Sequence, residues 1–170
     1  KLSMLKFQGK LALITGSGTG IGQAIAKRFV ENGASVIILG RRREPLDETS
    51  KMLEQIISEK NTGASVRIFA GVDVADETPM NDMFESLSKD NVTVDYIINN
   101  AGVSGPVTCF ANAPMNEFKS TVAIHLTGTF WGSVQALKVM KSGGKIITIS
   151  TFFTEERPLE QRPYRFRSPY

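Results

Sequence analysis

Residues 10–22 read K-L-A-L-I-T-G-S-G-T-G-I-G and decide the fold of this chain. Residues 11–14 are an apolar, partly β-branched run that ends at Thr15 and Gly16, and a helical pattern begins near Gly20. The stretch therefore predicts a strand, a glycine turn and a helix. Glycines let the backbone of such a turn approach a pyrophosphate closely, and the N–H groups and dipole at the start of the helix attract the anion. We expect a phosphate-binding turn here.

A glycine-rich turn is by itself a weak signal, because such turns also serve tight packing between a strand and a helix. The main functional alternative is the P-loop of nucleotide triphosphatases, which needs a Lys followed by Ser or Thr after its last glycine. Here Gly22 is followed by Gln23, Ala24 and Ile25. The P-loop is thereby excluded, while packing alone and dinucleotide binding both remain.

The composition is that of one ordinary globular domain, with 170 residues, 41% of them hydrophobic and 22% charged. This length allows a sizeable core. The net charge is only +3, and the arginines gather in two local groups, at 41–43 and 157–167, so we expect no nucleic-acid partner. The single cysteine, Cys109, excludes an internal disulfide and favours a reducing compartment. No apolar run approaches the length of about 18 residues that a membrane span needs, so we expect no membrane contact and a cytoplasmic or organelle-matrix location.

Apolar runs and helical patterns alternate along residues 1–150. We expect further strands at 35–39, 66–70, 94–98 and 145–149, and helices at about 20–31, 45–60, 77–89 and 115–140. Continuous apolar strands that alternate with helices predict an α/β fold with a doubly wound parallel sheet covered by helices on both faces. Residues 1–150 form the predicted dinucleotide-binding domain, and residues 151–170 lack periodicity and form an irregular segment leading to the catalytic region.

Each candidate functional group follows the end of a predicted strand. Gly16 follows the first strand, Arg41 the second, Asp73 the third, Asn100 the fourth, and Ser150 with Thr151 the fifth. In a doubly wound sheet the carboxyl ends of the strands border one crevice, in which ligands bind. We therefore expect these groups to line a single dinucleotide site.

The motifs resemble those of the short-chain dehydrogenase/reductase family. T-G-S-G-T-G-I-G at residues 15–22 is similar to the cofactor turn of that family, N-N-A-G at 99–102 to its second hallmark, and G-K-I-I-T-I-S at 144–150 to the strand before its catalytic serine. The resemblance extends over nearly the whole chain. It implies a Rossmann-like fold and hydride transfer between a nicotinamide cofactor and a carbonyl or alcohol. A domain of this family continues beyond the point where this sequence ends, so we expect that the C-terminal part is missing and that about the first two thirds are present.

The resemblance also implies which residues bind the cofactor. The glycine turn would contact the diphosphate, Asp73 and Val74 the adenine, and the N-N-A-G turn the ribose, with Asn99 bracing the sheet. The implied cofactor-binding residues are Gly16, Ser17, Thr19, Gly20, Ile21, Asp73, Val74, Asn100, Ala101 and Gly102. No metal site is expected.

The residues after the second strand bear on the choice of dinucleotide. NAD enzymes of this fold commonly place a carboxylate there to bond the ribose hydroxyls, whereas the 2′-phosphate of NADP needs positive charge. Gly40 stands at that place and Arg41 follows it. The sequence therefore predicts NADP, with NAD as the less favoured cofactor. Part of the arginine run at 41–43 is expected to be a solvated loop.

The catalytic region departs from the family pattern. The resemblance implies a serine that hydrogen-bonds the substrate oxygen, and here Thr151 stands at that position with Ser150 as its alternative. The asparagine of the long helix is replaced by His125, whose imidazole can also hydrogen-bond but can titrate. Structural packing of His125 is the other possibility.

The family's Tyr-x-x-x-Lys motif is not visible. In it, a tyrosine with a pKa lowered by lysine and cofactor acts as general acid/base. Tyr164 lies 13 positions after Thr151, but Ser168 stands where the lysine belongs, and Tyr170 is the last residue. The context S-P-Y favours Tyr170 over Tyr164.

The sequence thus predicts an NADP-dependent oxidoreductase acting on a small carbonyl or secondary alcohol. Two alternatives stay open: an enoyl or dienoyl thioester reductase of the same fold, acting on an acyl thioester, and a non-catalytic dinucleotide-binding regulatory protein. The long helix from residue 115 resembles one that pairs subunits in this family, which implies a homodimer or homotetramer.

Overall fold

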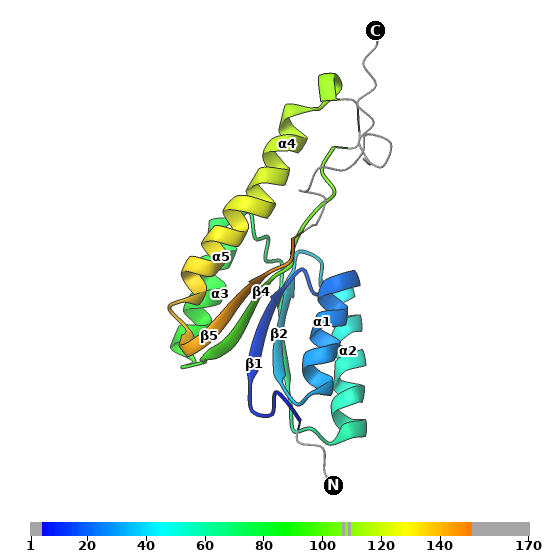
Figure 1. Ribbon diagram of the computed structural model, residues 1–170, viewed down its shortest axis with the longest axis vertical. Helices are drawn as coiled ribbons and strands as arrows, with labels where there is room; N and C mark the ends of the chain where they lie inside the picture. Colours follow the sequence, from blue (N-terminus) through cyan, green and yellow to red (C-terminus); the bar gives the residue numbers. More distant parts are fainter. Residues whose placement is uncertain (1–4, 107, 109, 151–170) are drawn as a thin grey trace.

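The computed structural model describes residues 5–106, 108 and 110–150 and contains a five-stranded sheet between two layers of helices (Figure 1). All neighbouring strands are parallel, in the order β3-β2-β1-β4-β5. This order confirms the doubly wound, Rossmann-like fold. The strands are β1 Leu11–Thr15, β2 Ser35–Gly40, β3 Val66–Ala70, β4 Val94–Asn99 and β5 Met140–Thr148.

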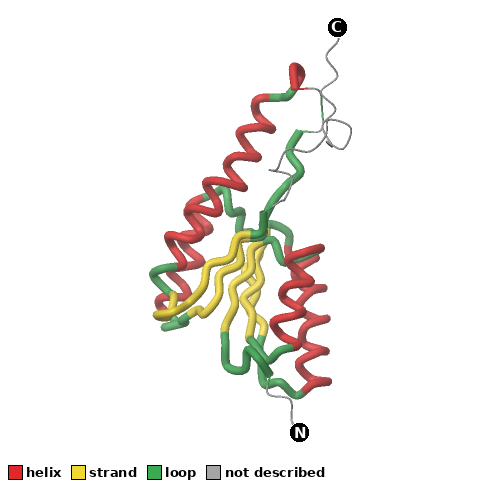
Figure 2. Tube along the Cα trace, viewed as in Figure 1, coloured by secondary structure: helices red, strands yellow, loops and turns green. Residues whose placement is uncertain are grey.

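Helices cover both faces of the sheet, as Figures 1 and 2 show. Two lie on one face, α1 Gly20–Glu31 and α2 Arg43–Lys60. On the other face lie α3 Glu77–Lys89 and a long bent helix, which consists of α4 Met115–Val122, the π-helix η2 Ala123–Gly128 and α5 Thr129–Ala136. The short 3-10 helix η1 Phe110–Asn112 precedes α4. In Figure 1, α4 extends beyond the carboxyl end of the sheet.

Successive side chains of the strands enter two separate cores, because they point to opposite faces of the sheet. Leu13 and Ile37 lie in the core under α3 and α5, whereas Ile14 and Ile38 lie in the core under α1 and α2. All four are at most 1% exposed. A sheet buried on both faces requires such continuous apolar strands, which explains why the sequence pattern predicted the parallel sheet correctly.

The long helix and the last strand differ from the prediction at their boundary. The helix was expected to reach Met140, but α5 ends at Ala136 and Met140 begins β5. The N–H of Val94 donates to the carbonyl of Val139 at 2.8 Å, so the chain already pairs with β4 before the glycines at 143–144. The register between β4 and β5 shifts after Val94, and this irregularity lets those glycines lie within the strand rather than in a turn.

A charged cluster fastens the end of the sheet opposite to the strand carboxyl ends. Asp95 accepts hydrogen bonds from Lys10 Nζ at 3.1 Å and from the N–H of Leu11 at 3.0 Å, and Lys141 Nζ lies 3.6 Å away. The Asp95 side chain is only 8% exposed. Burial acts to raise its pKa, but the bonds from Leu11 and Lys10 and the charge of Lys141 outweigh burial and lower the pKa.

Within the described ranges, no helix is long and apolar enough to cross a bilayer. Cys109 and the segment at 151–170 lie outside the described residues.

Candidate dinucleotide-binding site

The glycine turn between β1 and α1 uses its glycines in two different ways. Gly16 has a φ of 64°, and a Cβ on it would lie 2.8 Å from the Cα of Ala101, so the turn after β1 packs directly on the turn after β4. Gly20 also has a positive φ, 57°, but a Cβ there would meet nothing within 4 Å. Gly16 therefore allows the two turns to pack closely, whereas Gly20 borders open space.

The N-terminus of α1 is not capped by a side chain. Thr19 is the N-cap residue but makes no side-chain capping bond, whereas the N-terminus of α3 is capped by Asp76, which accepts the N–H of Thr78 at 3.0 Å. The N–H groups in the first turn of a helix have no partner inside the helix. At α1 they remain available to an anionic ligand, and the helix dipole favours negative charge there.

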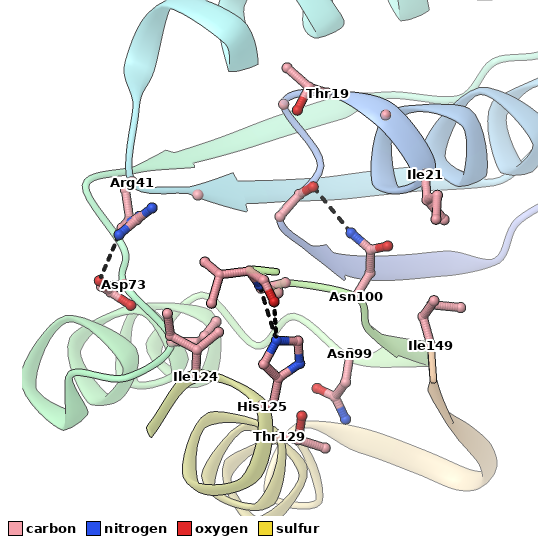
Figure 3. Close-up of a pocket in the computed structure, with 18 of the residues that line it drawn as sticks. Thr19, Ile21, Arg41, Asp73, Asn99, Asn100, Ile124, His125, Thr129 and Ile149 are labelled. Carbon is pink, nitrogen blue, oxygen red and sulfur yellow. Dashed lines mark hydrogen bonds and ion pairs between the residues drawn. The ribbon is translucent and has the colours of Figure 1, made fainter. Parts of the chain in front are cut away.

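Asn100 and Thr15 lock the two turns together. The Asn100 side-chain amide donates to the carbonyl of Thr15 at 2.9 Å. It also donates to the carbonyl of Gly16 at 3.2 Å, and Figure 3 shows Asn100 beside the glycine turn. In return, Thr15 Oγ1 accepts the N–H groups of Asn100 and Ala101, both at 2.9 Å. Each buried polar group thus finds a partner, and the glycine turn is fixed before any ligand arrives.

A cavity of about 680 Å³ lies along the carboxyl ends of the strands, within the size range of small-molecule sites. In Figure 3, Arg41 and Asp73 lie on one side of it and Ile149 lies on the opposite side. The structure brings together most of the residues predicted from the sequence. Those that line the cavity are Gly16, Thr19, Gly20, Ile21, Arg41, Asp73, Val74, Asn100, Ala101, Gly102, His125 and Ser150.

Ser17 is the one predicted cofactor-binding residue that does not line the cavity. Its side chain is completely buried, donates to the carbonyl of Ile14 at 3.0 Å and accepts the N–H of Leu39 at 3.0 Å. Its own N–H donates to the carbonyl of Leu39. Both donors of Ser17, its hydroxyl and its N–H, are therefore used in hydrogen bonds at the junction of β1 and β2. The family resemblance implied that Ser17 contacts the cofactor, but the sequence gives no sign of which way the hydroxyl points.

Three of the predicted catalytic residues, Thr151, Tyr164 and Tyr170, lie outside the described residues.

Other residues line the cavity but were not predicted from the sequence, although two of them, Val103 and Ser104, directly follow the N-N-A-G motif. Ile124 and Thr129 flank His125 on the bent helix. The residues that sequence reasoning did not select are Gly18, Gly40, Arg42, Pro45, Leu46, Val72, Asn99, Val103, Ser104, Ile124, Thr129, Thr148 and Ile149.

Ile21, which the family resemblance placed at the cofactor, lies at the start of α1 and lines the cavity. Its side chain is large and apolar but 63% exposed, whereas Ala26 on the same helix is fully buried. The start of α1 therefore presents an apolar side chain to the cavity rather than to the core.

The arginines after β2 divide into two groups. Arg41 and Arg42 line the cavity, and Arg41 Nη1 lies 3.8 Å from Asp73 Oδ2. Arg43 instead points along α2, where its Nε donates to both carboxylate oxygens of Asp47 at 2.8 and 3.0 Å. Among the described residues Arg42 forms no ion pair. The mouth of the cavity beside β2 therefore carries net positive charge, with Asp73 as the only nearby carboxylate in the cavity lining.

His125 projects from the π-helix and holds the chain after β4. Its Nε2 lies 3.0 Å from the Val103 nitrogen and 2.8 Å from the Val103 oxygen. One ring nitrogen can accept from the first or donate to the second, depending on its protonation, but cannot do both at once. The ring also lies against Gly102, where a Cβ would be 2.6 Å from His125 Cε1. π-helical turns frequently mark functional positions, and this one directs an imidazole toward the cavity.

Asn99 borders the cavity, but its side-chain amide is bonded to the helix layer. Its side chain is 5% exposed and donates to Ser133 Oγ at 2.9 Å, and Ser133 in turn donates to the carbonyl of Thr129. This chain of bonds fixes α5 on β4.

Within the described part of the chain, no group of three or more His, Cys, Asp or Glu is placed to hold a metal ion.

With this geometry established, comparison with known proteins identifies the family. The family model described as short chain dehydrogenase matches residues 10–165. The chain belongs to the short chain dehydrogenase family. The matched region includes the glycine turn, both arginines of the cavity mouth and the His125 helix.

Relatives and solved structures of the short chain dehydrogenases agree with this assignment. A 3alpha-hydroxysteroid dehydrogenase of Mediterraneibacter gnavus is 30% identical over 147 residues, 86% of this chain and 56% of that protein. The crystal structure of an NAD+-bound xylitol dehydrogenase matches with a TM-score of 0.74 and 28% identity, over 84% of this chain and 53% of the other. A short chain dehydrogenase from Burkholderia cenocepacia in complex with NADP matches with a TM-score of 0.73 and 25% identity, over 84% and 55% of the two chains.

The chain spans 53% to 59% of the length of the first curated relatives that it matches. The two ligand-bound short chain dehydrogenases named above contain different dinucleotides, NAD+ in one and NADP in the other. Family membership therefore supports a dinucleotide site without choosing between the two cofactors.

Proposed function

We propose that this chain is the dinucleotide-binding part of an oxidoreductase that transfers a hydride between NADP(H) and a small carbonyl or secondary alcohol. The observation that carries the choice of NADP is the arginine pair at the mouth of the cavity. Gly40 ends β2 without a carboxylate, and Arg41 and Arg42 follow it at the cavity edge. A 2′-phosphate needs positive charge at this place, whereas a free ribose diol is usually bonded by a carboxylate.

The residues present fit a dinucleotide along the whole cavity. The uncapped N–H groups of α1 and the open side of Gly20 suit the diphosphate, and Asp73 and Val74 lie at the adenine side beside Arg41. Asn100, Ala101 and Gly102 would border the ribose of the nicotinamide half. Bound nicotinamide would supply the hydride donor or acceptor.

The substrate side of the cavity is formed by the end of β5 and the bent helix. Ser150 lies there and is exposed. We assign to it, or to Thr151 next to it, a hydrogen bond to the substrate oxygen. His125 holds the neighbouring backbone at Val103 and would shape the same wall. Tyr170, with Tyr164 as its alternative, is proposed to exchange the proton of the substrate oxygen.

An apolar stripe on the long bent helix supports assembly with a second copy of the chain. Its members are 54% to 68% exposed although they are large and hydrophobic, and contiguous apolar surface of this kind marks interaction sites. We propose a homodimer, or a homotetramer built from it, with this helix at the interface. The stripe consists of Met115, Phe118, Leu126, Phe130 and Leu137.

Sedimentation velocity of the protein tests this assembly. The wild type is expected to sediment as a dimer or tetramer, and Phe130→Glu as a monomer, because a buried unpaired carboxylate disfavours association. A matched substitution on the outer face of α3, Glu85→Gln, should leave the assembly unchanged. A monomeric wild type would contradict the proposal.

Turnover measurements test the proposed reaction. Purified protein is assayed by absorbance of the reduced cofactor with a panel of ketones, aldehydes and secondary alcohols, using NADP(H) and NAD(H) in parallel. We expect turnover with members of this panel and a higher kcat/KM for NADP(H). Turnover only with enoyl or dienoyl thioesters would favour the thioester reductase, and cofactor binding without turnover on either panel would favour a regulatory protein.

A further inference from the structure

A single buried hydroxyl joins the glycine turn to both helices on its face of the sheet. Thr49, on α2, is fully buried, and its Oγ1 donates to the carbonyl of Gly18 at 3.1 Å. The same oxygen accepts a hydrogen bond from Gln23 Nε2, on α1, at 2.9 Å. Because Gln23 supplies a proton to this oxygen, the hydroxyl hydrogen is left to face Gly18.

The Gly18 carbonyl depends on this contact. Among the described residues, Thr49 is its only hydrogen-bond donor. The turn is also closely packed at this point, since a Cβ on Gly18 would lie 3.0 Å from Cβ of Pro45. The Gly18 carbonyl is partly buried, so the loss of its one donor carries a desolvation penalty unless the turn moves to find another.

The direction of the Gly18 carbonyl sets the direction of the next N–H group. The peptide unit between Gly18 and Thr19 is planar and trans, as are the other described peptide bonds, so its C=O and N–H point in opposite directions. With the carbonyl held against α2, the N–H of Thr19 points away from α2. Thr19 is the N-cap of α1 and lines the cavity.

The same helix also carries the cavity edge beside β2. Pro45 and Leu46 line the cavity, and Thr49 follows Leu46 by three residues, on the same side of α2. The side of α2 that borders the ribose region is thereby tied to the turn that faces the diphosphate region.

We propose that Thr49 is a positioning residue for the phosphate turn: its hydroxyl holds the Gly18 carbonyl and so directs the N–H of Thr19 at the cofactor diphosphate. The inference rests on the proposed dinucleotide site, because that site supplies the anion. Thr49 itself touches no ligand and acts through the backbone of Gly18.

The test compares hydroxyl deletions at adjacent positions of α2. Thr49→Val removes the hydroxyl and keeps the shape of the side chain, and Thr49→Ser restores the hydroxyl. Ser50→Ala is the matched control, because Glu54 of its own helix is the only partner of Ser50 Oγ in the described part of the chain. Gln23→Ala on α1 is a second variant that leaves α2 intact. Affinities for NADPH and for 2′-AMP, which lacks the diphosphate, are measured by calorimetry, and thermal unfolding establishes that each variant is folded.

Thr49→Val is expected to weaken NADPH binding by about 3- to 15-fold, the loss of roughly one hydrogen bond, with 2′-AMP binding unchanged. Thr49→Ser and Ser50→Ala should bind both ligands like the wild type, and Gln23→Ala should weaken NADPH binding in the same sense by a smaller factor. Equal NADPH affinities of Thr49→Val and Ser50→Ala would overturn the inference, as would an equal loss of NADPH and 2′-AMP. A wild type that binds neither ligand would overturn the proposed dinucleotide site itself.

Discussion

Replacement of Arg41 by alanine should change the choice of cofactor. The Arg41 side chain is 63% exposed, so its attraction to a 2′-phosphate is screened, and a contribution at the low end for a charged hydrogen bond, about 1–2 kcal/mol, is appropriate. Arg41 also neutralises Asp73, which lies 3.8 Å away. Its removal would leave a carboxylate facing the phosphate, and this repulsion acts in the same direction. We therefore expect NADPH affinity to fall by about 5- to 30-fold and NADH affinity to change less than about twofold.

Arg43→Ala provides the matched control, since Arg43 is held by Asp47 on the surface of α2 and lies outside the cavity lining. Dissociation constants of NADPH and NADH are measured for the wild type and both variants by fluorescence titration. The measurements are repeated at about 1 M salt, where the Debye length is about 3 Å and the advantage of NADPH should shrink. Equal losses of NADPH and NADH affinity in Arg41→Ala, or the same NADPH loss in Arg43→Ala, would refute the reasoning.

Four further substitutions, at three positions, probe the stability of the fold and the walls of the site. Asp95→Asn should lower the free energy of unfolding at pH 7 by about 1–3 kcal/mol in urea titrations. Because the pKa of Asp95 is lowered in the folded state, the stabilisation by its carboxylate is present above about pH 4 and is lost as the pH falls through the folded pKa. The unfolding free energies of wild type and variant should therefore become equal in acid. Gly16→Ala should destabilise the fold by about 1–3 kcal/mol and weaken NADPH binding, since the residue has a positive φ and would contact Ala101. His125→Asn should keep turnover within about threefold of wild type, because an amide can bond both the N–H and the carbonyl of Val103. His125→Leu should lower turnover by about 5- to 30-fold. Equal turnover of the two variants would exclude the contact with Val103 as a determinant of the rate.

The strands and most helices could be predicted because their burial is periodic and complete. Ile14 and Ile38 lie in strands covered on both faces, and Met80 and Leu87 occupy one helical stripe that is fully buried. The boundary between α5 and β5 could not be predicted, because pairing with Val94 starts the strand before Gly143. Such pairing depends on a distant segment and leaves no local signal.

The site was predictable to the extent that topology determines it. Residues that follow parallel strands must meet at one edge of the sheet, and Arg41, Asp73 and Asn100 do so. Side-chain direction was not predictable, as Ser17 shows, whose hydroxyl bonds Leu39 in the sheet rather than lining the cavity. Nor could the sequence reveal that Thr49, far from any motif, contacts the glycine turn.

The most direct test of the central claim is the binding of NADPH and NADH to the unmodified protein, measured by isothermal titration calorimetry at physiological salt. The arginine pair at the mouth of the cavity predicts a single dinucleotide site per chain that binds NADPH at least about tenfold more tightly than NADH. Tighter binding of NADH would contradict the assignment of NADP, and binding of neither dinucleotide would contradict the site.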